Sequence, residues 1–102
     1  MDADRAYRRS RRNLALVREV LMREWDPIGI AGEPAAMDEY DTYALKAALM
    51  VVEGNASAEA LAAYLMLVAT VLMEFPRTDE LAARSERTAA ALVALRPTLA
   101  AD

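Results

Sequence analysis

Apolar residues recur at helical spacing along most of the chain. Near its start, Tyr7, Leu14, Val17, Leu21 and Trp25 are placed so that they share one side of a helix. Three later stretches show the same period, and no run alternates as a half-buried strand does. The pattern predicts an all-α fold, a small four-helix bundle with a long loop between helices 1 and 2. The expected helices cover about 4–25, 41–54, 58–75 and 79–95.

Residues that begin and end helices stand at the expected boundaries. Ser, Thr and Asp side chains accept hydrogen bonds from the first N–H groups of a helix, and proline or a left-handed glycine or asparagine ends one. We therefore expect N-caps at Asp38 or Asp41, Ser57 and Thr78, and helix ends at Asp26-Pro27, Gly54-Asn55, Pro76 and Pro97. The chain after Pro97 is expected to be frayed.

The connection between the first two helices, at about 26–37, is long for a compact domain. Connections of this kind are usually functional, or else they are packed down by their own apolar residues, here Ile28, Ile30 and Met37. The sequence therefore directs attention to this loop as a candidate site.

The third expected helix carries no charge over residues 60–73. This run is too short to span a bilayer, so we expect no membrane segment and a helix buried on most sides. Some apolar residues lie partly off the main stripes: Met50, Val51, Met66, Leu67 and Met73. Two interpretations stay open. Either the third helix is simply the core helix, or the surplus forms an interface, for which a homodimer is the most economical arrangement.

Length and composition limit the chemistry. The 102 residues suit a single helical domain over 1–102, and a hydrophobic content of 56% favours a folded chain. The absence of cysteine and histidine excludes disulfides, thiolate ligands and His-based triads. No cofactor motif is recognisable, so we expect no cofactor. The charged start lacks the apolar segment of a signal peptide, which predicts a cytoplasmic protein of bacterial type.

Charge is distributed unevenly along the chain. Residues 1–23 hold seven arginines and three acids, whereas residues 24–41 hold six acids and no base. We use the name arginine cluster for Arg5, Arg8, Arg9, Arg11 and Arg12. Such a cluster can bind phosphates, but the net charge of −4 and the lack of a nucleic-acid-binding motif argue against this use. The favoured interpretation is a solvated helix end that pairs with the acidic loop.

The acidic block also raises the question of a cation site. Asp26, Asp38, Glu39 and Asp41 offer the oxygen ligands that Ca²⁺ prefers. Their spacing lacks the alternating ligands and central glycine of an EF-hand loop, and helix capping accounts for Asp38 and Asp41. General acid–base catalysis needs a shaped cleft, which four short helices rarely provide. We therefore expect no metal site, no catalytic residue and no enzymatic activity.

Two motifs resemble a known family. Trp25-Asp26-Pro27-Ile28-Gly29-Ile30 and Asp38-Glu39-Tyr40-Asp41-Thr42-Tyr43 are similar to the signature of a family of small, uncharacterised bacterial helical proteins, a domain of unknown function. The similarity covers roughly residues 17–75 and continues at Gly54, Ala56, Ser57, Ala58, Glu59, Tyr64 and Leu65. Some similar proteins lie beside genes for contact-dependent or polymorphic toxins, which implies an immunity role for those members.

The chain departs from this family pattern late in the third helix. Relatives tend to carry a polar Glu-His-Met-Gly ending, whereas this chain has Val71-Leu72-Met73-Glu74. The resemblance therefore implies no chemistry at this position.

Together these features predict a non-enzymatic protein-interaction module. We expect a protein partner, either a toxin or a second copy of the chain, because aromatic anchors rimmed by charge suit such a contact. The expected contact residues are Trp25, Asp26, Asp38, Glu39, Tyr40, Asp41 and Tyr43. On a basic nuclease toxin, the acids would cover the phosphate-binding surface and block it. The alternative is a nucleic-acid-binding or regulatory protein that uses the arginine cluster.

Overall fold

The computed structural model describes residues 2–29 and 38–101, and across these two ranges it contains helices and no strand. The helices are α1 (Asp2–Val20), which continues as a π-helical turn, η1 (Leu21–Trp25); α2 (Asp41–Val52); α3 (Ala58–Leu67), which continues as η3 (Val68–Leu72); α4 (Asp79–Ala94); and α5 (Arg96–Ala100). The all-α prediction is confirmed. Most of the expected loop, with Ile30 and Met37, lies outside the described residues.

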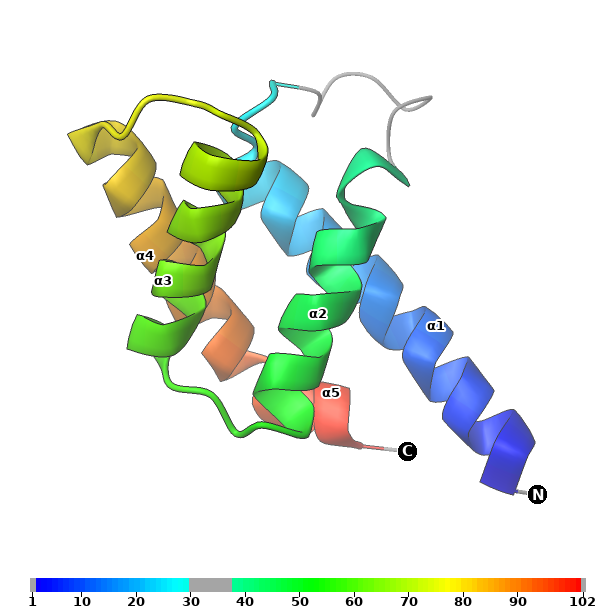
Figure 1. Cartoon of the computed structure of the whole chain (residues 1–102). Coiled ribbons are helices and arrows are strands. Elements are labelled where there is room, and N and C mark those ends of the chain that lie inside the picture. The colour runs from blue at the N-terminus through cyan, green and yellow to red at the C-terminus, as the bar shows by residue number, and fades with distance from the viewer. Residues whose placement is uncertain (1, 30–37, 102) are drawn as a thin grey trace.

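Two helix pairs make up the body of the protein (Figure 1). α3 packs along α4, and α2 packs against α1. α4 also contacts η1 and so joins the two pairs, while the short α5 packs against α2. The N-terminal end of α1 projects past the other helices, and the side chains of residues 3–8 are exposed. The protein therefore has a packed helical body and one free helix end.

The hydrophobic core is built from the helix sides on which apolar residues recur at helical spacing. Val17, Leu21 and Trp25 are fully buried and belong to one cluster with Leu61 of α3 and Leu92 of α4. Burying a side chain of this size stabilises the fold by about 1.5–3 kcal/mol relative to leaving it exposed. The junction between the two helix pairs is therefore closed by large apolar side chains from three helices.

Two apolar stretches are more exposed than the pattern predicts. Tyr7 is 62% exposed, because no helix lies beside α1 at that point. Leu61 and Leu65 are buried on one side of α3, whereas Leu67 and Val71 on its other side are 53% and 60% exposed. The expectation that the third helix is buried on most sides is wrong, because only α4 packs extensively along it.

Both π-helical turns end their helices. The backbone N–H groups of Asp26 and Met73 donate to the carbonyl oxygens of Leu21 and Val68, five residues back, at 2.9 Å in each case. After each turn the backbone enters the left-handed region: Asp26, the residue after η1, has φ 37°, and Glu74, two residues after η3, has φ 60°. The third helix consequently ends before the expected residue 75.

Two predicted N-caps and the predicted end of α2 are confirmed, as is the predicted end of the first helix at Asp26-Pro27. Ser57 Oγ accepts a hydrogen bond from the N–H of Ala60 (3.1 Å), and Thr78 Oγ1 accepts one from the N–H of Leu81 (3.0 Å). Asn55 has φ 46° and provides the left-handed stop after α2. These three boundaries depend on local bonds that a short sequence pattern specifies.

The predicted cap of α2 by Asp38 or Asp41 is wrong. Tyr40 occupies the N-cap position, and its side chain makes no capping hydrogen bond. Asp41 is the first residue of the helix, and its carboxylate binds Arg18 of α1 instead. A charged partner on another helix competes successfully with the local backbone donors.

The C-terminal segment is ordered, so the expectation of a frayed end after Pro97 is also wrong. Pro97 lies in the first turn of α5, where its missing N–H costs no hydrogen bond, and Leu99 is fully buried. Arg12 Nη2 donates to the carbonyl oxygens of Thr98 (2.8 Å) and Leu99 (3.2 Å), and Asn13 Nδ2 donates to that of Leu99 (2.8 Å). Side chains of α1 therefore hold the last helix.

Candidate functional site

One buried tyrosine fixes the acidic motif to the end of the first helix. Tyr40 Oη donates to Asp26 Oδ1 (2.8 Å) and accepts a hydrogen bond from the N–H of Ile28 (3.1 Å). Its ring lies 5.5 Å from that of Trp25, centroid to centroid, and both rings are fully buried. Burial, and then the hydrogen bond to Asp26, raise the pKa of Tyr40. We use the name aromatic corner for Trp25, Asp26, Ile28 and Tyr40.

Asp26 also shapes the turn that follows. Its backbone lies in the left-handed region (φ 37°, ψ 57°), which Asp tolerates better than most residues. Its Oδ1 and its backbone carbonyl oxygen both accept a hydrogen bond from the N–H of Gly29, three residues on, at 3.1 Å each, which closes a β-turn. Gly29 has φ 81°, where glycine is favoured. The carboxylate of Asp26 therefore serves both the turn and the aromatic corner.

Asp38 and Glu39 come directly before Tyr40 of the aromatic corner, and their side chains face solvent. Both are exposed, and they lie in the short 3₁₀ turn that leads into α2. Asp41 points back toward α1, where its two carboxylate oxygens accept from Arg18 Nε (2.8 Å) and Nη2 (2.9 Å). This hydrogen-bonded pair raises the pKa of Arg18. We use the name acidic tip for Asp38 and Glu39.

Tyr43 lies one turn further along α2 and is half-buried. Its backbone carbonyl accepts a hydrogen bond from Tyr64 Oη of α3 (3.3 Å), and burial raises the pKa of Tyr64 to about 12. The bond connects α2 to α3, so the residues beside the acidic tip have a structural role as well.

The structure brings the predicted contact residues together but divides them between surface and core. Trp25 and Tyr40 are fully buried, Asp26, Asp41 and Tyr43 are half-buried, and Asp38 and Glu39 are exposed. In this conformation the rings of Trp25 and Tyr40 support the surface rather than form it. A contact with a partner at the acidic tip stays a prediction.

The arginine cluster is exposed on the free end of α1. Arg5, Arg8 and Arg11 are exposed, and Arg9 is half-buried. The Arg11 guanidinium lies 5.9 Å from the ring centroid of Tyr7, and its Nη1 donates to the tyrosine hydroxyl (3.2 Å). This end of the helix therefore presents several cations and one aromatic ring to solvent.

Arg12 belongs to the cluster in sequence but has a structural role, which the sequence analysis missed. Its Nη2 group donates to the carbonyl oxygens of Thr98 and Ala101, each at 2.8 Å. Arg96 acts similarly on α2, because its Nε donates to the carbonyl oxygen of Val51 (2.9 Å). The last carbonyls of a helix lack intrahelical donors, so both arginines complete a helix end. The sequence gives only a general signal for this role: the last carbonyl groups of every helix need hydrogen-bond donors.

The two charge blocks are far apart in the fold. Figure 1 places the free end of α1 and the start of α2 at opposite ends of the molecule, so the arginine cluster does not lie beside the acidic tip. Within residues 2–29 and 38–101, Arg18–Asp41 joins the two blocks across the fold, and Arg23–Glu24 joins them between neighbouring residues. The arginine cluster is expected from the sequence to pair with the acidic loop, but Asp38 and Glu39 of that loop lie away from the cluster, and the part of the loop with Glu33 lies outside the described residues.

Exposed apolar residues lie outside both charge blocks. Leu45 and Leu49 of α2 are exposed and line a groove of about 370 Å³, with Arg9 and Asn13 of α1 on the opposite wall. The outer side of α3 is exposed as well. The surface thus offers apolar contact area in addition to the two charged ends.

The described ranges contain neither a cluster of metal ligands nor a membrane-spanning helix. Nowhere in residues 2–29 and 38–101 do three or more acidic side chains come together in a way that could hold a metal ion. No helix within the same ranges is long and apolar enough to cross a membrane.

Comparisons with known proteins give no relative. No protein-family model matches the chain, and neither curated proteins nor solved structures give a match. The resemblance of the two motifs to a family of bacterial helical proteins stays a prediction, and any function has to be argued from the surface itself.

Proposed function

We propose that the protein is a non-catalytic, cytoplasmic protein-binding module whose acidic tip docks on a basic surface of another protein. The observation that carries this proposal is the anchoring of the tip. Asp38 and Glu39 are exposed, yet the next residue, Tyr40, is locked to Asp26 and Ile28 by two hydrogen bonds.

A tip anchored in this way loses little conformational freedom when a partner binds. Pre-ordered contact groups gain affinity because less entropy is lost on association. Two adjacent carboxylates also attract a basic surface over a distance and suppress binding to acidic ones. A nucleic-acid-processing toxin would present such a basic surface, and coverage of that surface would make the module an immunity-type protein.

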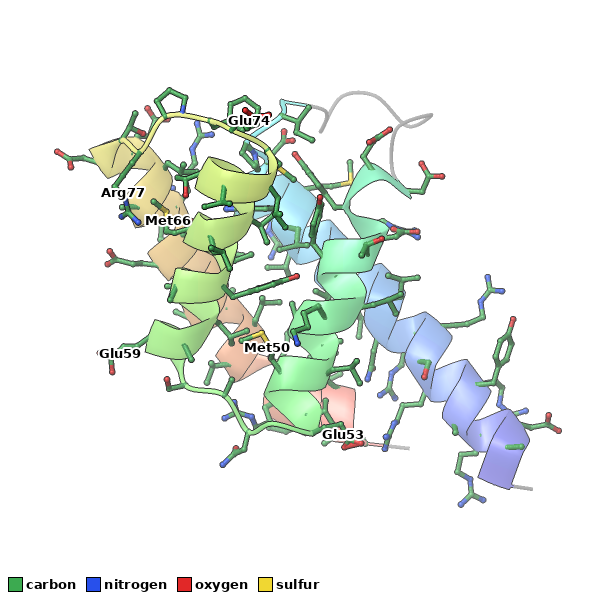
Figure 2. The ribbon with its side chains drawn as sticks, viewed as in Figure 1. Met50, Glu53, Glu59, Met66, Glu74 and Arg77 are labelled. Carbon is green, nitrogen blue, oxygen red and sulfur yellow. The ribbon has the colours of Figure 1, made fainter. Side chains whose placement is uncertain are left out.

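The test uses affinity capture from cells of the native organism, with a nuclease wash. Wild-type protein is compared with an Asp38→Asn, Glu39→Gln double variant, which removes two charges and keeps the side-chain size. Glu53→Gln is the matched control, since Glu53 is an exposed acid at the other end of α2 (Figure 2). We expect a protein that survives the wash with wild type and with Glu53→Gln but is lost with the double variant. Equal recovery with all three would contradict the proposal.

A second candidate, nucleic-acid binding, is favoured by the free end of α1. Residues 3–8 are exposed on every side, and Arg5, Arg8 and Arg11 point three guanidinium groups into solvent. If these groups contact phosphates, log affinity should fall with log salt by about 0.9 for each contact on duplex DNA. Replacing Arg8 and Arg11 with Gln should reduce that slope, measured by fluorescence anisotropy. No retention of DNA or RNA at low salt would dismiss this candidate.

A further inference from the structure

The groove between α1 and α2 combines exposed apolar residues with a hollow of limited size. Leu45, Leu49 and Val52 of α2 line one wall, and Arg9 and Ser10 of α1 line the other. Its volume of about 370 Å³ lies at the lower end of the range for small-molecule sites, about 300–1,000 Å³. Such sites are mostly apolar and contain a few polar groups. The α1–α2 groove has this composition.

Small and turned-away side chains account for the hollow. Ala48 is nearly buried and lines the groove, so its methyl group leaves room that a larger side chain would fill. On the wall of α1, Ser10 is small, and the amide of Asn13 donates to the carbonyl oxygen of Leu99 (2.8 Å). Asn13 is thus held toward α5 rather than extended across the groove. The hollow therefore follows from the residues that pack α1 against α2 and α5.

The wall on α2 is apolar and yet in contact with solvent. Leu45 and Leu49 are one helical turn apart, and Leu49 is 58% exposed. Removing apolar surface from water is favourable in proportion to the area that is covered. A concave wall of this kind favours a ligand with a hydrocarbon body.

The charges of the lining do not select a charged ligand. Arg9 and Glu53 both line the groove, one cation and one anion. A carboxylate in the groove would be repelled by Glu53, and an ammonium group would be repelled by Arg9. Either ion would also lose part of its hydration beside the leucines, which is unfavourable. The lining therefore favours an uncharged polar group, such as a hydroxyl.

We propose that the α1–α2 groove binds a small, elongated, uncharged molecule with an apolar chain and one polar end, such as a fatty alcohol. At about 30 Å³ for each water-sized group, a volume of about 370 Å³ holds about a dozen non-hydrogen atoms. The chain covers Leu45 and Leu49, and the polar end bonds to the exposed hydroxyl of Ser10. The acidic tip precedes the first turn of α2, away from this groove, so the site and the proposed function can fail independently.

The first test is a fluorescence displacement titration of the full chain. The probe is N-phenyl-1-naphthylamine, which is uncharged and fluoresces in apolar surroundings. We expect saturable binding of the probe and its displacement by 1-decanol. Decanoate and decylammonium have the same chain but carry a charge, so they should displace the probe about tenfold less well. No saturable binding, or equal displacement by all three compounds, would overturn the proposal.

The second test locates the site with three variants. Leu49→Gln removes part of the apolar wall and should weaken 1-decanol binding about tenfold. Leu72→Gln is the matched control, because Leu72 is 61% exposed at the end of η3, outside the groove, and it should leave binding unchanged. Ser10→Phe adds apolar surface but fills the groove from α1, so it should abolish binding. Circular dichroism of each variant checks that the helices are retained.

Two results of the second test would overturn the proposal. Equal weakening by Leu49→Gln and Leu72→Gln, or unchanged binding in Ser10→Phe, would mean that the compounds adhere to exposed apolar surface in general.

A second copy of the chain is the competing occupant of the groove, and analytical ultracentrifugation separates the two cases. We expect a monomer with and without 1-decanol, at the protein concentrations of the titration. A dimer that dissociates when 1-decanol is added, or that is lost in Ser10→Phe, would assign the groove to a protein contact and overturn the small-molecule proposal.

Discussion

Tyr40 connects the acidic tip to the end of the first helix through a single hydroxyl group. That group donates to Asp26 and accepts from Ile28, in a place where the ring has no contact with solvent. Replacement by phenylalanine would leave the carboxylate and the backbone N–H without this partner while the ring packing stays.

Tyr40→Phe is therefore expected to lower the free energy of unfolding by about 1–2 kcal/mol at neutral pH. The folded-state pKa of Tyr40 lies above its ordinary value of 10.0, so the folded protein holds the proton more tightly than the unfolded chain. That stabilisation is fully present below pH 10 and is lost as pH rises, so the gap between variant and wild type should shrink. Urea unfolding at neutral pH and above pH 10 measures both effects.

The matched control is Tyr7→Phe, because Tyr7 is exposed and its hydroxyl bonds only to the exposed Arg11 in the described part of the chain. It should change stability little. An equal loss in both variants, or a gap that grows with pH, would argue against the role assigned to Tyr40.

At the residue scale the sequence predicts bonds that stay local. Ser57 and Thr78 cap helices by accepting from N–H groups three residues ahead, and residue type with position suffices to foresee this. Asp41 looks like a cap by the same rule, but its partner Arg18 lies 23 residues away on α1. The choice between a local and a distant partner depends on the packing of two helices, which no local pattern contains.

The last helix illustrates the same limit at the scale of elements. The sequence predicts a frayed end because Pro97 is expected to stop the fourth helix, and the five residues of α5 are too few to form a stable helix alone. The helix is held because Leu99 is buried and because Arg12 and Asn13 bind its carbonyl oxygens from α1. Those partners lie more than eighty residues away along the chain.

Arg12→Gln should loosen α5 and lower the free energy of unfolding by about 1–2 kcal/mol, since hydrogen bonds from a charged donor are lost. Arg8→Gln, one turn earlier and exposed, is the control and should have little effect. Hydrogen exchange of the α5 amides locates the change, and faster exchange is expected there first. If α5 exchanges at the wild-type rate in Arg12→Gln, the account of this helix end is wrong.

In the third helix, the spacing of apolar residues predicts which residues are buried but not which apolar side is exposed. Its buried residues Leu61 and Leu65 are readable from the spacing, and so is the uncharged run. Which of its apolar sides lacks a neighbour is set by the placement of α2 and α4. The joint exposure of Ala60, Ala63, Leu67 and Val71 on one side of the third helix therefore becomes visible only in three dimensions.

At the scale of the whole molecule, three surfaces are set apart by the fold. The acidic tip stands at the start of α2, the arginine cluster stands on the free end of α1, and the exposed apolar side of α3 belongs to a helix that α2 separates from α1 (Figure 1). The uneven distribution of charge along the sequence predicts the two charged surfaces, but it does not predict that they lie at opposite ends of the molecule.

The central claim is that the acidic tip binds a protein. The most direct measurement is the Kd of the captured partner, by titration calorimetry at low and moderate salt, for wild type, Asp38→Asn with Glu39→Gln, and Glu53→Gln. We expect the double variant to bind about tenfold or more weakly and to lose most of the salt dependence, with the control unchanged. The same Kd and the same salt dependence in all three proteins would contradict the claim.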